Sequence, residues 1–166
     1  MLETSHLIDL ARDEANPAGM GAPRQVNLRR AVSTAYYAVF HALLGNVSET
    51  FVADNVPRSR ALFYRAMEHG RAKDRCIKLG KNPLDQKEST FFQRPEFIPE
   101  LRKFANAFVR LQELRHRSDY DPDYRLTRAQ ALQIVDDARQ AIDDLHSSEG
   151  TQRNEFLAYL LLGLRL

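Results

Sequence analysis

Apolar residues recur every three or four positions along most of the chain, which is the spacing of amphipathic helices. The pattern is clearest in residues 25–45 and is weaker in residues 2–15. In the helix predicted over residues 25–45, Gly45 and Asn46 follow the last apolar turn and predict its end. The predicted buried stripes are Leu2, Leu7, Ile8, Leu10 and Ala11 in the first helix, and Leu28, Val32, Ala35, Tyr36, Val39, Phe40, Leu43 and Leu44 in the second.

Two more long helices are predicted in the second half of the chain. Residues 99–120 start at Pro99, which suits a first helical turn, and stop before Pro122. Thr127 is the expected N-cap of a helix over residues 128–146. The inward residues are predicted to be Leu101, Phe104, Phe108, Leu111 and Leu114 in one helix, and Ala131, Leu132, Val135, Ala138, Ile142 and Leu145 in the other.

The remaining segments complete an all-helical pattern. Residues 58–79 predict a helix with a weak point at Gly70, and residues 80–97 predict a loop insertion that carries an apolar pair, Phe91 and Phe92. The apolar tail, residues 154–166, predicts a short last helix that packs on the core or on a partner subunit. It is far shorter than the roughly 20 residues that span a bilayer, so no membrane partner is expected.

No segment alternates apolar and polar residues in the manner of a strand. The predicted fold class is therefore all-α: an antiparallel bundle of four to five main helices plus a short C-terminal helix, in a single domain over residues 1–166. The one cysteine, Cys76, cannot form a disulfide within the chain, and the amphipathic N-terminal segment is not expected to act as a signal peptide. A reducing, cytoplasmic setting is expected.

The distribution of charge along the chain allows two interpretations of one basic segment. The net charge is +2, from 24 basic and 22 acidic residues, and is too small to indicate nucleic acid. Between Arg58 and Lys81, however, eight basic residues accompany only two acidic ones. This run is either a surface that attracts a polyanion or an ordinary solvated helix face.

Several kinds of chemistry have no motif here. The sequence has no phosphate-binding glycine loop and no glycine-flanked serine nucleophile. Its five histidines are scattered, and none forms a ligand pair at helical spacing. No metal site and no cofactor are predicted.

One stretch, LQELRHRSDYDP at residues 111–122, concentrates groups that could act on a phosphodiester. Histidine can transfer protons near neutral pH, and the arginine guanidinium can hold two phosphate oxygens at once. Arg115, His116 and Arg117 thus form a minimal set for cutting RNA without a metal ion. The alternative is an ordinary helix end, in which Arg115 pairs with Asp119 four residues later.

Two stretches resemble the HEPN superfamily, the all-α "higher eukaryotes and prokaryotes nucleotide-binding" domains. RRAVSTAYYAVFHALLG, residues 29–45, is similar to the Tyr-Tyr-Ala-x-Phe-His helix of bacterial, toxin-like members. Residues 110–142 are similar to the later helix pair of the family, with its Asp-Tyr-Asp-Pro corner. The motif of the superfamily, an arginine followed within a few residues by a histidine, matches Arg110 and His116.

The resemblance implies a metal-independent endoribonuclease that works as a homodimer, with Arg110 on phosphate and His116 on proton transfer. RNA-binding roles are then expected for Arg115, Arg117, Asp119 and Tyr120, and for the polar stripe of Arg30, Tyr37 and His41, which would line the dimer cleft beside His116. The implied setting is a toxin–antitoxin or related defence system, with a small nucleotidyltransferase-type antitoxin as a possible partner.

Two alternatives to catalysis stay open. Leu111 stands directly after Arg110, where many active members of the superfamily carry Asn or Asp. This favours a non-catalytic HEPN module that binds nucleotides, RNA or a protein. The other alternative is a structural adaptor that docks through the apolar tail of residues 156–166.

Overall fold

The computed structural model describes residues 3–17, 21–52 and 57–164. These ranges contain eight helices and no strand, which confirms the all-α prediction. The helices are α1 (Thr4–Ala15), α2 (Gln25–Phe51), α3 (Pro57–Ala66), α4 (His69–Leu79), α5 (Gln86–Phe92), α6 (Pro99–Tyr120), α7 (Arg128–Ser147) and α8 (Gly150–Leu162).

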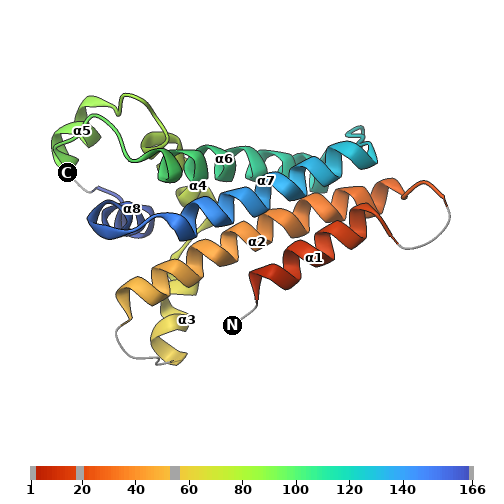
Figure 1. Cartoon of the computed structure of the whole chain (residues 1–166), viewed down its shortest axis with the longest axis horizontal. Coiled ribbons are helices and arrows are strands. Elements are labelled where there is room, and N and C mark those ends of the chain that lie inside the picture. Colours follow the sequence, from red (N-terminus) through yellow and green to blue (C-terminus); the bar gives the residue numbers. More distant parts are fainter. Residues whose placement is uncertain (1–2, 18–20, 53–56, 165–166) are drawn as a thin grey trace.

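The long helices form a bundle around α2 (Figure 1). α2 packs against α1, α6 and α7, while α4 packs against α6 and α8. Neighbouring helices in the chain, α1 with α2 and α6 with α7, run antiparallel (Figure 1). α5 and α8 lie together at the end of the bundle that holds the described C-terminus.

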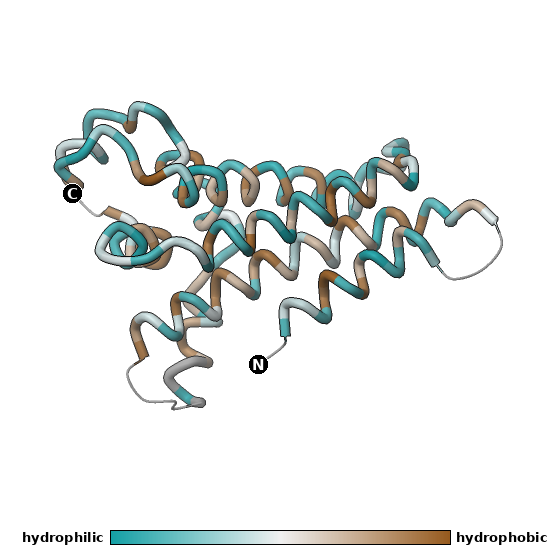
Figure 2. The backbone as a smooth tube through the Cα atoms, in the orientation of Figure 1, coloured by the Kyte–Doolittle hydropathy of each residue, from teal (hydrophilic) through white to brown (hydrophobic). Residues whose placement is uncertain are grey.

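Most residues of the predicted stripes are buried in the core, and Figure 2 shows hydrophobic positions recurring along the long helices. All eight stripe residues of α2 are buried, as are Leu101, Phe104, Phe108 and Leu111 of α6 and Ala131, Val135, Ala138, Ile142 and Leu145 of α7. The prediction was wrong for Leu10, which is 48% exposed. It lies about 200° around the helix from buried Ile8, so both cannot face the core. Leu2 lies outside the described residues.

The predicted end of the second helix was also wrong. α2 runs through Gly45 and Asn46 and ends at Phe51. The Asn46 side chain donates a hydrogen bond to the carbonyl of Ala42 at 2.8 Å, and its Oδ1 accepts one from Arg153 of α8. Because a distant helix supplies this partner, the polar residue is stabilised within α2 and does not end it.

The middle of the chain differs from prediction at two points. Residues 58–79 form two helices, α3 and α4, separated at Met67 and Glu68 and not at Gly70. Met67 is buried, so the chain bends where this side chain enters the core. The predicted loop of residues 80–97 contains α5, in which Phe92 is buried and Phe91 is 55% exposed.

The apolar tail packs on the core. α8 begins at Gly150, before the predicted start at residue 154, and residues 165–166 lie outside the described part. Phe156, Leu157, Tyr159 and Leu160 are buried, and the Tyr159 hydroxyl donates to the Glu88 carboxylate at 2.6 Å. Across the described ranges, no helix is long and apolar enough to cross a membrane.

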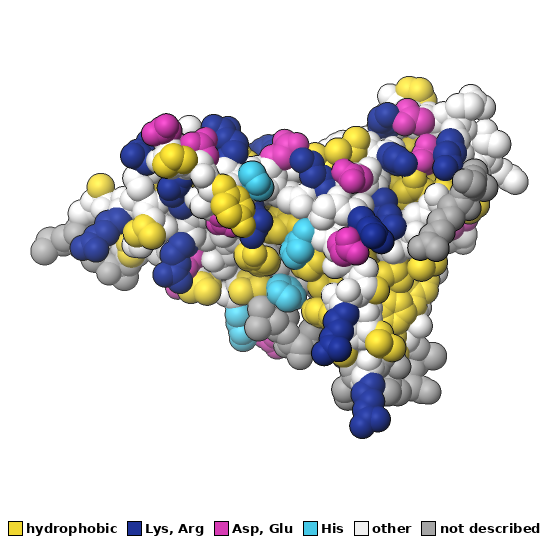
Figure 3. All heavy atoms as spheres, turned by 180° about the vertical axis from the view of Figure 1, so that it is seen from behind, with side chains coloured by type: hydrophobic (Ala, Val, Ile, Leu, Met, Phe, Trp, Pro, Cys, Tyr) yellow, Lys and Arg dark blue, Asp and Glu magenta, His cyan; other side chains and the backbone are white. Residues whose placement is uncertain are grey.

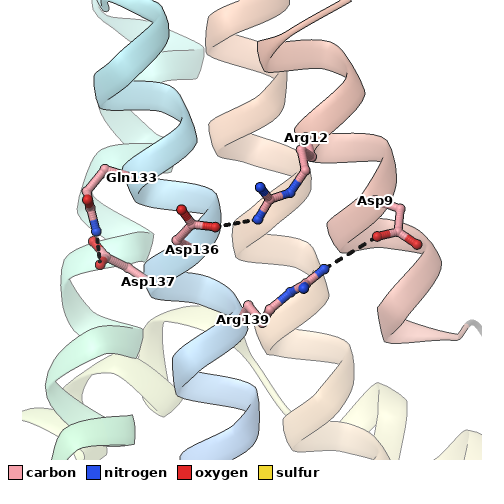
Figure 4. Close-up of polar contacts among 6 residues, drawn as sticks. All are labelled: Asp9, Arg12, Gln133, Asp136, Asp137 and Arg139. Carbon is pink, nitrogen blue, oxygen red and sulfur yellow. Dashed lines mark hydrogen bonds and ion pairs between the residues drawn. The ribbon is translucent and has the colours of Figure 1, made fainter.

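Ion pairs on the outer surface join the first helix to α7. Arg12 of α1 contacts Asp136, and Arg139 of α7 lies 3.5 Å from Asp9 (Figure 4). Figure 4 places Asp137 on the other side of α7 from Asp136. Asp136 therefore pairs with an arginine of α1, whereas Asp137 pairs with an arginine of α6.

Candidate functional site

The stretch of residues 111–122 is an intact helix for most of its length. α6 continues to Tyr120, and the amide of Asp121 still donates to the carbonyl of Arg117 at 3.0 Å. Successive helical residues point about 100° apart. Arg115, His116 and Arg117 therefore leave α6 in different directions and meet different neighbours.

Arg115 points toward α2 and is held there by several groups. Its Nη2 donates to the Tyr37 hydroxyl at 3.0 Å, and its Nε lies 2.8 Å from a carboxylate oxygen of Asp119. The guanidinium lies 5.6 Å from the ring centroid of Tyr37 and 5.8 Å from that of Tyr120. Asp119 is itself fixed by Ser33, which donates to its other oxygen at 2.5 Å.

This environment keeps the arginine charged while leaving it accessible. Burial works against the charged form, but the hydrogen bond with Tyr37 and the charge of Asp119 outweigh it, so the pKa of Arg115 is raised. The side chain is still 24% exposed. A charged, positioned guanidinium at the surface is suited to bind an anion, because little conformational freedom is lost on binding.

His116 lies beside this arginine on the exposed side of α6. Its ring centroid is 4.9 Å from that of Tyr120, whose ring also faces Arg115. His116 borders a hollow of about 490 Å³ between α4 and α6. The other lining residues are Lys73, Gln112, Glu113, Arg115 and Arg117.

Two cations on the rim of the hollow already have partners. Lys73 pairs with Glu113 at 2.9 Å, and the Arg117 guanidinium lies 4.3 Å from the ring centroid of Tyr124. The ring of Tyr124, in the connection that follows α6, therefore holds the Arg117 side chain. The rim is positively charged but is not a patch of unpaired cations.

Arg110 is directed to a different part of the molecule. It pairs with Asp137 of α7, which also accepts a hydrogen bond from Gln133 (Figure 4), and its side chain is 58% exposed. His116 lies about 120° around α6 from Arg110 and about 9 Å along it. Because α6 does not fray before Tyr120, one chain does not bring Arg110 and His116 together.

The polar stripe of α2 divides between two neighbours. Arg30 lies 3.3 Å from the Glu14 carboxylate of α1, and Thr34 donates to the same carboxylate at 2.7 Å. Arg30 is therefore tied to α1 and is not placed beside His116. Tyr37, further along the stripe, reaches Arg115 and through it the surroundings of His116.

His41 ends the stripe next to α3. Its ring lies 6.0 Å from that of Tyr64 and 6.3 Å from that of Phe40. Burial lowers its pKa. The Phe40 ring also stacks on His69, the first residue of α4, with centroids 3.8 Å apart, and so connects His41 to the rest of the site.

His69 is the functional candidate that the sequence did not indicate. Its Nδ1 lies 2.7 Å from the hydroxyl of Tyr36, and its ring stacks on Phe40 with centroids 3.8 Å apart. Its backbone carbonyl accepts a hydrogen bond from Gln112 of α6 at 3.0 Å. The spacing of residues along the sequence does not predict these contacts of His69, because Tyr36 and Gln112 belong to other helices.

Together these groups make a continuous surface across α2, α4 and α6, which we call the aromatic–cationic band. Its members are His41, His69, Tyr37, Arg115, Tyr120 and His116. Figure 3 shows histidine side chains gathered near the middle of the face that lies behind α2 in Figure 1, with basic side chains around them. Aromatic rings grouped around a fixed guanidinium are suited to contact bases and phosphates.

The basic run between Arg58 and Lys81 is largely neutralised in the folded chain. Arg75 donates to the carbonyls of Leu160 and Leu161 at 2.7 Å and so caps the end of α8. Other members pair with acids: Arg71 with Glu68, Lys73 with Glu113, Lys78 with Glu88 and Lys81 with Asp85. The structure therefore favours an ordinary helix surface over a polyanion-binding patch for most of this run.

We also searched for groups of metal-binding side chains and for similar proteins. In the part of the chain that the structure describes, no three or more His, Cys, Asp or Glu side chains are grouped to hold a metal ion. The sequence matches no known family model, and comparisons with curated proteins and with solved structures found no match.

Proposed function

We propose that the protein binds single-stranded RNA across the aromatic–cationic band and cuts it there as a HEPN-type, metal-independent endoribonuclease. The observation that carries the proposal is Arg115, which Tyr37 and Asp119 hold in place next to exposed His116. A fixed guanidinium beside an accessible imidazole provides a phosphate ligand and a proton acceptor within one helical turn.

The proposed reaction uses the ribose 2′-hydroxyl as the nucleophile. Its oxygen attacks the adjacent phosphorus, and the bond from phosphorus to the 5′ oxygen of the next nucleotide breaks. His116 accepts the 2′ proton, and water supplies the proton that the departing 5′ oxygen requires. Arg115 stabilises the charge that builds on the phosphate oxygens, with Lys73 and Arg117 on the rim of the hollow.

This assignment gives the phosphate contact to Arg115, because Arg110 pairs with Asp137 in the single chain. A role for Arg110 in the chemistry requires a second chain that places its Arg110 beside this His116. The homodimer that the HEPN resemblance implies would be the source of that second chain. The Arg110→Ala variant therefore separates a site within one chain from a site shared by two.

The test is RNA cleavage in the presence of EDTA, with wild type compared with His116→Ala, Arg115→Ala and Arg110→Ala. Arg139→Ala is the matched control, since this exposed arginine pairs with Asp9 away from the band. We expect wild type and the control to cut, and the His116 and Arg115 variants to lose cutting. Absence of cutting by wild type on several RNA classes would refute the catalytic proposal, and equal cutting by all variants would refute the site.

One observation favours a second candidate, a non-catalytic RNA-binding module of the same type. The hollow is lined by a single histidine, and the motif arginine, Arg110, is engaged elsewhere. Such a module would bind RNA through Arg115 without cutting it. Binding of intact RNA by wild type, weakened in Arg115→Ala and accompanied by no cleavage products, would establish this second candidate.

The biological setting is part of the proposal and has its own test. A toxin that cuts cellular RNA should stop growth when produced without its antitoxin. The HEPN resemblance suggests a small nucleotidyltransferase-type protein as that antitoxin. We expect growth arrest with wild type and normal growth with His116→Ala at equal protein levels, and normal growth with both would contradict a toxin role.

A further inference from the structure

His69 is held by contacts with three residues of α2 and is nevertheless an exposed residue. Phe40 covers one face of its ring, with centroids 3.8 Å apart and planes within 21° of parallel. Tyr36 binds its Nδ1 at 2.7 Å, and the Tyr37 ring meets it edge-on. The stacking on Phe40 and the hydrogen bond to Tyr36 leave the ring face opposite Phe40 and the edge that carries Nε2 open to a ligand.

The protonation of this histidine follows from its buried neighbour. Tyr36 is 1% exposed, and burial raises the pKa of its hydroxyl, so this hydroxyl keeps its proton. Within the described residues the hydroxyl has no hydrogen-bond acceptor other than Nδ1 of His69, so it donates to that nitrogen. The His69 proton is then on Nε2. Burial, followed by the charges of Arg115 and His41, lowers the pKa of His69 and favours the neutral ring.

The contacts of His69 also place it at the edge of the proposed RNA site. Gln112, which donates to the carbonyl of His69, lines the hollow and lies one helical turn before His116. Lys73, which also lines the hollow, follows His69 by one turn of α4. Four residues correspond to about 6 Å along the helix. Tyr37 contacts both Arg115 and His69, so a strand with one phosphate at Arg115 can place a neighbouring base over His69.

We propose that His69 is a nucleobase platform: one base of a bound single strand stacks on the ring face opposite Phe40. The inference rests on the proposed function and adds a base-binding subsite to it. Stacking on an aromatic side chain is a common way to hold unpaired bases. The ring is already fixed by Tyr36 and Phe40, so it loses little freedom when a base binds. Its Nε2–H remains available to an acceptor on the base or the backbone.

A purely structural role for His69 makes a different prediction. If the ring only fills space between α2 and α4, its removal disturbs the site as a whole and lowers the affinity for every RNA to the same extent. If a base stacks on it, the loss is confined to strands that have a base at the matching position. A comparison between protein variants and RNA variants separates these cases, in the manner of a double-mutant cycle.

The experiment measures the Kd of 2′-fluoro RNA strands, which lack the 2′-hydroxyl and cannot be cut by the proposed reaction. The strands are intact or carry one abasic residue at each position in turn, and binding is followed by fluorescence anisotropy. The proteins are wild type, His69→Ala, His69→Phe and the control Arg139→Ala, with folding checked by circular dichroism. We expect His69→Ala to raise Kd about tenfold for intact RNA and to have little effect when one particular base is missing.

The phenylalanine variant keeps a ring that can occupy the same place on Phe40 and still stack, while it removes the acceptor of the Tyr36 hydroxyl, so its folding is checked before its affinity is compared. We expect it to keep most of the affinity of wild type. Equal weakening of all strands by His69→Ala, or a loss in His69→Phe as large as in His69→Ala, would overturn the platform while leaving the RNA-binding proposal intact. Failure of wild type to bind any strand would refute the proposed function and the platform together.

Discussion

Replacing Arg115 with alanine should destabilise the protein more than the same replacement at Arg110. Arg115 loses a hydrogen bond in which the donor is charged, worth about 1.5–3 kcal/mol, and a partly buried ion pair. Asp119, which is 29% exposed, is then left without its cation. We expect a net loss of about 2 kcal/mol. Arg110 is 58% exposed, and pairs at such positions contribute up to about 1 kcal/mol.

The measurement is urea-induced unfolding of wild type, Arg115→Ala and Arg110→Ala, together with their melting temperatures. For a chain of this length, each 1 kcal/mol lowers Tm by about 2–4 °C, so we expect a drop of about 4–8 °C for the Arg115 variant. The Arg110 variant should stay within about 4 °C of wild type. A larger loss of stability for Arg110→Ala than for Arg115→Ala would refute the argument that Arg115 is the arginine whose contacts stabilise the fold.

Two further predictions concern pH and helix capping. Because the folded-state pKa values of His69 and His41 are lowered, the unfolded chain binds more protons as the pH falls through about 6.5. The free energy of unfolding should therefore decrease between about pH 7.5 and pH 5.5, and His69→Phe should reduce that decrease; an unchanged decrease in this variant would contradict the assignment to His69. Thr127→Ala should cost about 1 kcal/mol in urea unfolding, because Thr127 and Gln130 form a reciprocal capping box at the start of α7, and no loss would show that the cap does not stabilise the helix.

The long helices α6 and α7 could be predicted because local patterns determine them. Pro99 and Thr127 mark the starts of α6 and α7 through backbone geometry and capping, both of which depend only on nearby residues. The end of α2 could not be predicted in this way. Asn46 usually favours a helix end, but here Arg153, more than a hundred residues later, stabilises it inside the helix.

The site was predictable in part for the same reason. Arg115 and Asp119 are one helical turn apart, so their pairing follows from spacing in α6. The contact between Arg115 and Tyr37 depends on how α2 packs against α6, and the position of His69 depends on α4. Proximity in sequence also gave Arg110 a role beside His116, whereas the side of α6 on which it lies directs it to Asp137.

The central claim is that Arg115 contacts the phosphate backbone of a single strand. The most direct test is the dependence of RNA affinity on salt concentration for wild type, Arg115→Ala and the control Arg139→Ala. Each phosphate contact contributes about 0.7 to the slope of log K against log salt concentration for single strands. We predict that Arg115→Ala weakens binding and reduces the slope by about this amount, while the control does neither. An unchanged affinity and slope in Arg115→Ala would contradict the account.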